Sequence, residues 1–243
     1  MVKGRKQKPS QEDVRAYLSL LNEIKNERKM KVLNLYACLG GNRYKWNEVE
    51  PNIEVTAVEL DPANAAFYSD KFPNDTVIVG DAHNYLVENY HKFDFIWGSP
   101  PCPTHSRARF WSSKPNNKVK PVYPDMKLYQ EIVFLDNYYE GKWVIENVDP
   151  FYTPLIMPSV KMGRHLFWSN FKIPSKKFED ADIKNGKRKD WQDLHGFNIT
   201  GYKFNQRRDK ILRNCVNPLL GKYILDRALG IISHNITNQY QLF

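Results

Sequence analysis

The sequence predicts an α/β fold built on a doubly wound, mostly parallel sheet. Five short apolar runs alternate with stretches of helical spacing, which is typical of parallel strands joined by crossover helices. The chain has 243 residues, of which 42% are hydrophobic. A chain of this length buries enough surface to fold as one domain without disulfides or a structural metal.

The strands and helices of this sheet follow one another in a regular order. A capping box of Ser10 and Asp13 opens an amphipathic helix over 11–29, ahead of the sheet. The predicted strands are 31–37, 55–60, 76–79, 94–98 and 143–148, and the predicted crossover helices are 62–72, 83–91 and 125–140.

Cysteine content and the absence of apolar segments exclude several classes of protein. The three cysteines, Cys38, Cys102 and Cys215, are far apart and form neither a disulfide framework nor a zinc site. No apolar run approaches the ~18 residues of a membrane span, and residues 1–15 lack the apolar core of a secretory signal. We expect a protein of the cytoplasm, or a virus-encoded one acting in a bacterial cytoplasm, with no metal.

Basic charge is concentrated in two regions of a chain whose net charge is +9. Residues 1–10 hold four basic residues and no acid, and residues 172–213 hold twelve basic and six acidic residues. Such regions suit a polyanion, although a solvated basic surface explains charge alone equally well. Interleaved aromatic residues favour nucleic acid: Phe178, Trp191, Phe197, Tyr202 and Phe204.

Polar or glycine residues stand at the carboxyl ends of the predicted strands, where ligands bind in doubly wound sheets. In chain order they are Gly40-Gly41, Glu59, Asp81, Pro100-Pro101-Cys102 and Glu146-Asn147. Glycines let a ligand approach the backbone closely, and an acid ending the second strand suits ribose hydroxyls. Each feature has an ordinary structural explanation, but five at one edge predict a ligand site.

The same segments resemble, in order and type, the motifs of DNA cytosine-5 methyltransferases. They are LYACLGG (35–41), VELDP (58–62), GDA (80–82), GSPPCPTHS (98–106), ENV (146–148), GRHLFWSNF (163–171) and NCVNPLLGKYILDRAL (214–229). The most specific part is Pro-Pro-Cys followed some forty residues later by Glu-Asn-Val. The resemblance implies a Rossmann-like class I methyltransferase fold with a small basic insert, S-adenosylmethionine as cofactor, and DNA as substrate.

This resemblance also implies roles for individual residues. The catalytic residues would be Cys102, which adds to C6 of the flipped-out cytosine, Glu146, which contacts its N3 edge, and Arg164, which faces O2. The implied cofactor-binding residues are Tyr36, Ala37, Cys38, Leu39, Gly40, Gly41, Glu59, Leu60, Asp81, Ala82, Pro100, Asn214 and Val216. The implied substrate-binding residues are Pro101, Ser106, Arg107, Arg109, Asn147, Lys187, Arg188 and Lys189.

Several positions depart from the family pattern. Cys38 replaces a usual glycine, Pro103 a usual glutamine and His105 a usual aromatic residue, and the arginine motif is reduced to Arg164. The stretch between Phe171 and Gln206 is far shorter than the usual target-recognition region. We therefore expect a short or permissive target site.

The predicted organisation has five parts. They are a basic tail and helix (1–29), a catalytic core (30–171), a target-recognition insert (172–206), a segment returning to the core (207–235) and a C-terminal tail (236–243). Residues 98–125 form a long connection that begins near Cys102 and is too proline-rich at 114–124 for a helix interior. We interpret it as a loop that closes on DNA, with Arg107 and Arg109 either supplying positive charge near the thiol or holding phosphate.

Other functions remain open at this point. Ser99-Pro100-Pro101 also fits amino-group methyltransferases, but Cys102 is not the aromatic residue they require. A DNA-binding relic without turnover, and an RNA substrate, are further alternatives. In the tail, Gln239, Leu242 and Phe243 resemble the peptide by which bacterial replication proteins bind the sliding clamp, which predicts that partner.

Overall fold

The computed structural model describes residues 10–12, 14–15, 28–114, 120–179 and 186–231. Residues 11–12 and 14–15 are helical. Residues 13 and 16–27 of the helix predicted over 11–29 lie outside the described residues, and residues 28–29 are not helical. The basic tail (1–9) and the proposed clamp peptide (236–243) also lie outside them. Within the described ranges, no helix combines the length and apolar character that a membrane crossing requires.

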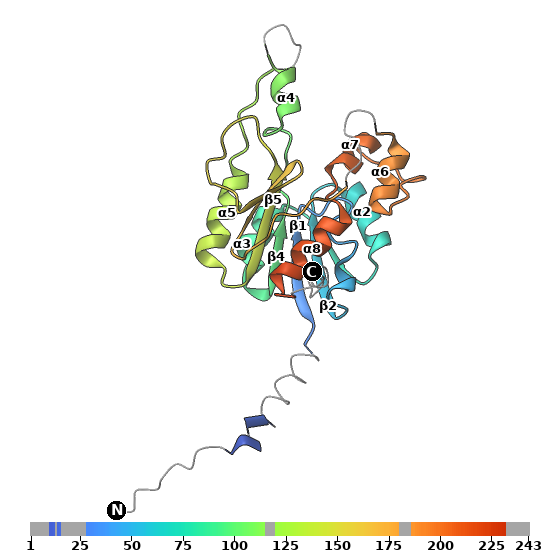
Figure 1. Cartoon of the computed structure of the whole chain (residues 1–243). Coiled ribbons are helices and arrows are strands. Elements are labelled where there is room, and N and C mark those ends of the chain that lie inside the picture. The colour runs from blue at the N-terminus through green and yellow to red at the C-terminus, as the bar shows by residue number, and fades with distance from the viewer. Residues whose placement is uncertain (1–9, 13, 16–27, 115–119, 180–185, 232–243) are drawn as a thin grey trace, which may run out of the picture.

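The core is a seven-stranded sheet in the order β3-β2-β1-β4-β5-β7-β6 (Figure 1). Its strands are β1 (Met30–Leu35), β2 (Ile53–Glu59), β3 (Thr76–Val79), β4 (Phe95–Gly98), β5 (Lys142–Val148), β6 (Val160–Met162) and β7 (His165–Ser169). The first five are parallel, and β7 runs antiparallel to both β5 and β6. The doubly wound, mostly parallel α/β fold and its five parallel strands are thus confirmed.

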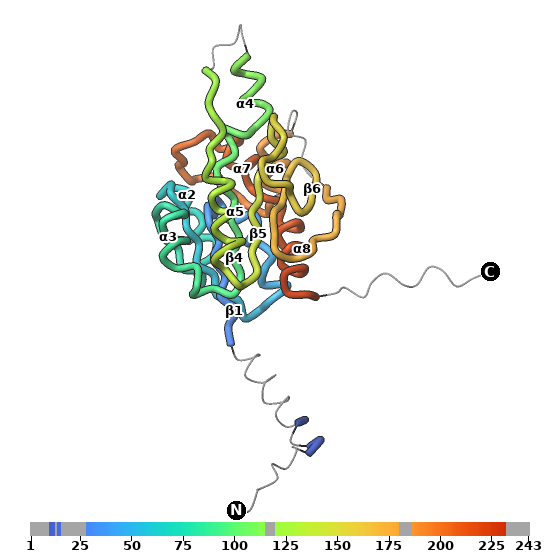
Figure 2. The backbone as a smooth tube through the Cα atoms, turned by 90° about the vertical axis from the view of Figure 1, so that its left-hand side faces the viewer, coloured from blue at the N-terminus to red at the C-terminus, as the bar shows by residue number. Residues whose placement is uncertain are grey.

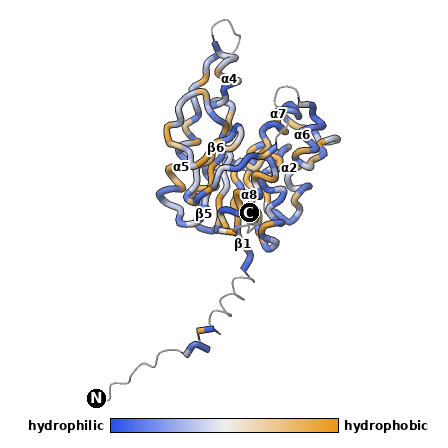
Figure 3. The backbone as a smooth tube through the Cα atoms, in the orientation of Figure 1, coloured by the Kyte–Doolittle hydropathy of each residue, from blue (hydrophilic) through white to orange (hydrophobic). Residues whose placement is uncertain are grey.

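Helices cover both faces of the sheet. They are α2 (Pro62–Lys71), α3 (Ala82–Asn89), α4 (Arg107–Ser112), α5 (Lys127–Tyr138), α6 (Arg188–His195), α7 (Arg208–Asn214) and α8 (Pro218–Ala228), with short 3-10 helices η1 (Trp46–Glu48) and η2 (Tyr90–Lys92). Successive residues of β1 point to opposite faces, so Leu33 packs with α3 and α5 while Val32 packs with α8. Figure 3 shows hydrophobic residues concentrated in these central strands.

A third apolar cluster joins the insert to the sheet. Trp191 of α6 and Leu212 of α7 pack with Phe67 and Tyr68 of α2. We call residues 186–214 the α6–α7 lobe. Figures 1 and 2 show this lobe and α4 standing beyond the carboxyl ends of the parallel strands.

Two local features differ from the sequence-based expectation. The segment 98–125 is not one irregular loop, because residues Arg107–Ser112 form α4. The antiparallel pair β6–β7 is not among the predicted strands, since β6 has only three residues and Gly163 turns between the two with φ +59°.

Candidate active site

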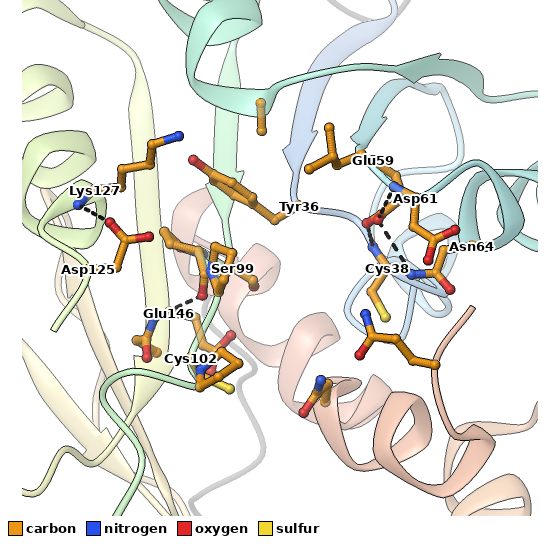
Figure 4. Close-up of a pocket in the computed structure, with 18 of the residues that line it drawn as sticks. Tyr36, Cys38, Glu59, Asp61, Asn64, Ser99, Cys102, Asp125, Lys127 and Glu146 are labelled. Atoms are coloured by element: carbon orange, nitrogen blue, oxygen red, sulfur yellow. Dashed lines mark hydrogen bonds between the residues drawn. The ribbon is translucent and has the colours of Figure 1, made fainter. Parts of the chain in front are cut away.

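A cavity of about 540 Å³ opens beyond the carboxyl ends of β1, β2, β3, β4 and β5 (Figure 4). This volume lies within the range of roughly 300–1,000 Å³ that is usual for small-molecule sites. Thirteen residues named from the sequence line it: Tyr36, Cys38, Glu59, Leu60, Asp81, Ala82, Pro100, Pro101, Cys102, Glu146, Asn147, Arg164 and Asn214. The fold therefore gathers in one place residues that are up to 178 positions apart.

The loop after β1 is the first wall of the cavity. Tyr36 and Cys38 adopt left-handed backbone conformations, with φ of 58° and 48°. Cys38 thus keeps the conformation that a glycine adopts easily, at the position where the family has glycine. Gly40 and Gly41 do not line the cavity, because they allow close packing against Phe72 and the Val216 carbonyl. The remaining residues expected at the cofactor are absent from its wall: Ala37, Leu39 and Val216 are buried.

Glu59 ends β2 and is held rigidly by the surrounding backbone. One carboxylate oxygen accepts the N–H of Cys38 at 2.8 Å, and the other accepts the N–H of Asp61 at 2.9 Å. The Asn64 amide also donates to the second of these oxygens, at 3.4 Å. Because a carboxylate has about four acceptor sites, Glu59 retains capacity to accept a hydroxyl group of a ligand.

Asp81 follows β3 by two residues and caps α3 by accepting the N–H of Asn84 at 3.0 Å. That hydrogen bond, together with Lys127 at 3.5 Å, keeps the pKa of Asp81 below its usual value. Nearby, the Tyr36 hydroxyl donates to the buried Glu131 at 2.6 Å, which fixes the ring at the cavity wall.

The loop that carries Cys102 is fixed by backbone contacts. The Cys102 carbonyl accepts the N–H groups of His105 and Ser106 at 3.0 and 3.1 Å. The Asn147 amide donates to the Pro100 carbonyl at 2.9 Å, so Asn147 positions this loop. His105 is buried, and its Nδ1 lies 2.6 Å from the Tyr152 hydroxyl.

Glu146 of β5 lies at the cavity with only 6% of its surface exposed. Burial raises its pKa to about 7, while a Ser99 hydrogen bond and the Arg164 charge oppose this effect. His165 lies 3.7 Å away, and burial lowers the pKa of His165 to about 3. Near neutral pH the site thus holds a neutral histidine and a carboxyl group that is partly protonated.

The charges of Glu146 and Arg164 also act on the Cys102 thiol. Burial, followed by the Glu146 charge, raises its pKa to about 11, and Arg164 and Lys210 act in the opposite direction. The expectation that Arg107 and Arg109 supply this positive field is wrong. Arg107 pairs with Asp149 at 3.1 Å, and Arg109 lines a separate hollow because α4 extends away from the thiol.

Arg164 connects the sheet to the α6–α7 lobe. It lies between β6 and β7, and its Nη2 donates to the Arg213 carbonyl at 2.6 Å. Its guanidinium lies 5.9 Å from the centre of the Trp191 ring. The lobe therefore orients Arg164, the cation among the described residues that lowers the pKa of both Cys102 and Glu146.

The lobe also corrects the sequence-based reading of its aromatic residues. Trp191 and Phe197 are almost fully buried, and Tyr202 and Phe204 pack against the same cluster, so these rings form a core. Phe178 packs against the cluster under α8. Lys187, Arg188 and Lys189 start α6 at the surface and do not line the cavity.

Sequence reasoning missed several cavity residues from this region. The lobe contributes Asn205, Gln206, Lys210 and Arg213 to the wall, besides Asn214. Their only signal in the sequence is the spacing of Lys210 and Arg213, which puts both cations on one side of α7. Among the described residues, no group of three or more His, Cys, Asp or Glu side chains is arranged to hold a metal ion.

Comparison with known proteins identifies the family. The model of the C-5 cytosine-specific DNA methylases matches residues 30–153, which is just over half of the chain. The chain belongs to this family. No curated protein sequence matches it.

Solved structures resemble this chain at low identity. A DNMT2 variant from Spodoptera frugiperda is 19% identical over 63% of this chain and 54% of that chain, with a TM-score of 0.41. The methyltransferase EhMeth from Entamoeba histolytica is 12% identical over 84% and 99%, with a TM-score of 0.46. A putative DNA modification methyltransferase encoded within an Escherichia coli prophage is 15% identical over 65% and 54%, with a TM-score of 0.41. The chain spans about half the length of the first and third of these proteins.

The methyl donor of this family is S-adenosylmethionine, and the cavity residues fit it. The Glu59 carboxylate has acceptor capacity for ribose hydroxyls, and Asp81 is available beside it for an amino group. Leu60, Ala82 and Pro100 supply apolar surface for a flat ring.

Proposed function

We propose that this protein transfers a methyl group from S-adenosylmethionine to C5 of a cytosine in DNA, through a covalent bond between Cys102 and C6. One observation carries the proposal. Cys102, Glu146 and Arg164 line the same cavity as Glu59 and Asp81, so the groups for the base and for the cofactor adjoin one another.

The chemistry follows from the weak nucleophilicity of C5. The Cys102 thiolate forms a bond to C6, and the π electrons of C5=C6 move to C5, which becomes nucleophilic. S-adenosylmethionine supplies the methyl group as an electrophilic sulfonium when it is bound. A base then removes the C5 proton, the C5=C6 bond forms again, and the Cys102 thiolate leaves.

Glu146 links this addition to proton transfer. With a pKa of about 7, its carboxyl group is partly protonated at neutral pH and can donate to N3 of the base. A protonated Glu146 no longer carries the negative charge that raises the pKa of Cys102. Donation to N3 and formation of the thiolate therefore assist each other, and Arg164 stabilises the developing charge.

The target base has to leave the helical stack to reach a thiol in this cavity. Base flipping costs a few kcal/mol, which contacts with the displaced base and the backbone must offset. The positively charged lobe contributes residues to the cavity wall, and α4 stands beyond the same strand ends (Figure 1), so both are available for those contacts.

A trapping experiment tests the proposal. In the presence of S-adenosylmethionine, we expect DNA containing 5-fluorocytosine to form a stable adduct on Cys102, because the methylated C5 then lacks the proton that must leave. Cys102→Ala should form no adduct and transfer no methyl group, yet bind S-adenosylmethionine with nearly unchanged affinity by calorimetry. Cys215→Ala is the matched control, since this thiol is buried outside the cavity.

The result also separates the alternatives. Methyl transfer by Cys102→Ala within tenfold of wild type would overturn the covalent mechanism and favour amino-group methylation. Cofactor and DNA binding without methyl transfer would identify a relic. Methylation of RNA but not DNA in the same assay would change the substrate class.

The C-terminal clamp peptide is a separate proposal. We expect a peptide of residues 236–243 to bind a bacterial sliding clamp with micromolar affinity, and to lose binding when Leu242 and Phe243 become alanine. Absence of binding by the unmodified peptide contradicts it.

A further inference from the structure

A projecting segment next to the active site exposes large aromatic side chains. We call residues 103–114 and 120–125 the aromatic arm; it contains α4 and stands above the sheet in Figures 1 and 2. Trp111 is 60% exposed and Tyr123 is 78% exposed. The other five tryptophans of the chain are all buried, so Trp111 is its one exposed indole ring.

Hydrogen bonds fix the base of the arm. The Thr104 hydroxyl accepts the N–H of Asp125 at 2.9 Å. This hydrogen bond joins the two chain segments of the arm at its base. Ser106 forms a β-bridge with Pro150, and the His105 carbonyl accepts the N–H of Phe151 at 3.2 Å. The arm is thus anchored directly beyond Cys102.

A hollow on the arm is lined by apolar side chains and by two cations. Phe110 and Phe151 stack with ring centres 4.4 Å apart and planes 3° apart, and Tyr123 and Val122 belong to the same lining. Arg109 and Lys114 also line it, and the Lys114 ammonium lies 5.6 Å from the centre of the Phe110 ring. Among the described lining residues there is no acid, and none also lines the active-site cavity.

This combination matches an unpaired nucleotide. Flat aromatic surfaces stack on the faces of bases, and flanking cations bind the phosphates on either side. An apolar peptide would use the rings but leave Arg109 and Lys114 without a role. Charge complementarity therefore favours a nucleic acid strand.

We propose that the hollow binds an unpaired nucleobase of the DNA strand, as a stacking site distinct from the cavity that holds the target cytosine. The proposal rests on the proposed function. In this arrangement the aromatic arm holds the DNA strand open beside the reacting base.

Trp111 provides a direct measurement. Because the other tryptophans are buried, acrylamide should quench mainly Trp111 in the cofactor-free protein. Oligothymidylate of about ten nucleotides contains no cytosine, so any protection of Trp111 reports on the arm rather than on methyl transfer. We expect single-stranded oligothymidylate to at least halve the quenching constant, and a fully paired duplex of equal length to protect less.

Matched variants assign the effect to the hollow. Tyr123→Ala should weaken oligothymidylate binding by roughly five- to a hundredfold, the range for loss of one base-stacking aromatic residue. Tyr123→Phe should retain binding. Tyr138→Ala, which removes an equally exposed tyrosine from α5, should bind like wild type.

The outcomes distinguish this inference from the proposed function. If wild type methylates DNA but oligothymidylate leaves Trp111 quenching unchanged, the inference is wrong and the function stands. Protection that persists undiminished in Tyr123→Ala also overturns it. Oligothymidylate binding that depends on Tyr123, without any methyl transfer, overturns the proposed function and leaves the stacking site in place. Failure to bind any nucleic acid overturns both.

Discussion

The aromatic arm and the α6–α7 lobe flank the same cavity and use similar residues in opposite ways. Both are rich in aromatic and basic side chains. In the lobe, Trp191 is fully buried against α2, whereas in the arm Trp111 is 60% exposed. The lobe rings are part of the hydrophobic core, and the arm presents its rings to solvent.

The difference arises from what each region packs against. α6 and α7 pack against Phe67 and Tyr68, so Trp191 of α6 is covered, while the polar side of α7 faces the cavity. α4 is only six residues long and has Phe151 as its stacking partner. An aromatic-basic composition thus indicates a nucleic-acid surface only where no apolar partner is within reach.

The largest expected effect comes from replacing Glu146, the buried carboxyl group whose pKa the Arg164 charge lowers. The lobe orients Arg164 through the Arg213 carbonyl. Glu146→Gln should lower the rate of methyl transfer by about 10²–10⁴-fold, the usual contribution of acid–base assistance. Steady-state kinetics on DNA measures this loss, and a decrease below about fivefold would contradict the proton-donor role.

The pH dependence of kcat/KM tests the protonation state of Glu146. Below pH about 7 both Glu146 and Cys102 are protonated, and the reactive state has lost one proton, so kcat/KM should rise tenfold per pH unit. Wild type should level off above pH about 7, whereas Glu146→Gln should keep rising toward the higher pKa of the thiol. Equal profiles for both proteins would exclude Glu146 as the group that titrates.

Stability distinguishes a buried ring from an exposed one. Trp191→Ala should lower the free energy of unfolding by about 3–5 kcal/mol, because it leaves a cavity in the lobe core. Trp111→Ala should change it by less than about 1 kcal/mol. Chemical denaturation of both variants checks this, and equal losses would mean that the two regions do not differ as described.

Salt dependence compares the two regions on DNA. Each phosphate contact contributes about 0.9 to the slope of log K against log salt concentration on duplex DNA. Replacing Lys187, Arg188 and Lys189 together by alanine should reduce the slope by up to about 3 if the lobe binds the backbone. Replacing Arg109 and Lys114 should reduce it by up to about 2. An unchanged slope in either variant would show that those cations face solvent in the complex.

The smallest effect concerns the reactivity of Cys102. Removing the Lys210 charge should raise the pKa of the thiol further and slow its alkylation by iodoacetamide, by less than about tenfold. Arg107→Gln should leave alkylation unchanged, since Arg107 is paired with Asp149. Mass spectrometry of the Cys102 peptide measures both rates. A larger effect from Arg107→Gln would restore the arm as the source of positive charge.

The parallel sheet was predictable because strand ends carry local signals. Apolar runs, helical spacing and the residues Glu59, Asp81, Cys102 and Glu146 are all readable along the chain. Parallel strands bring their carboxyl ends to one edge, so the meeting of these residues follows from the fold class alone.

The structure decided what depends on contacts between distant segments. The sequence could not reveal that Gly40 and Gly41 serve packing, that Lys210 faces the thiol, or that Arg164 is held by Arg213. Trp191 and Trp111 are the same residue type in similarly basic surroundings. Burial is a property of the whole fold, and only the presence of α2 beneath one ring and of solvent around the other separates a core from a binding surface.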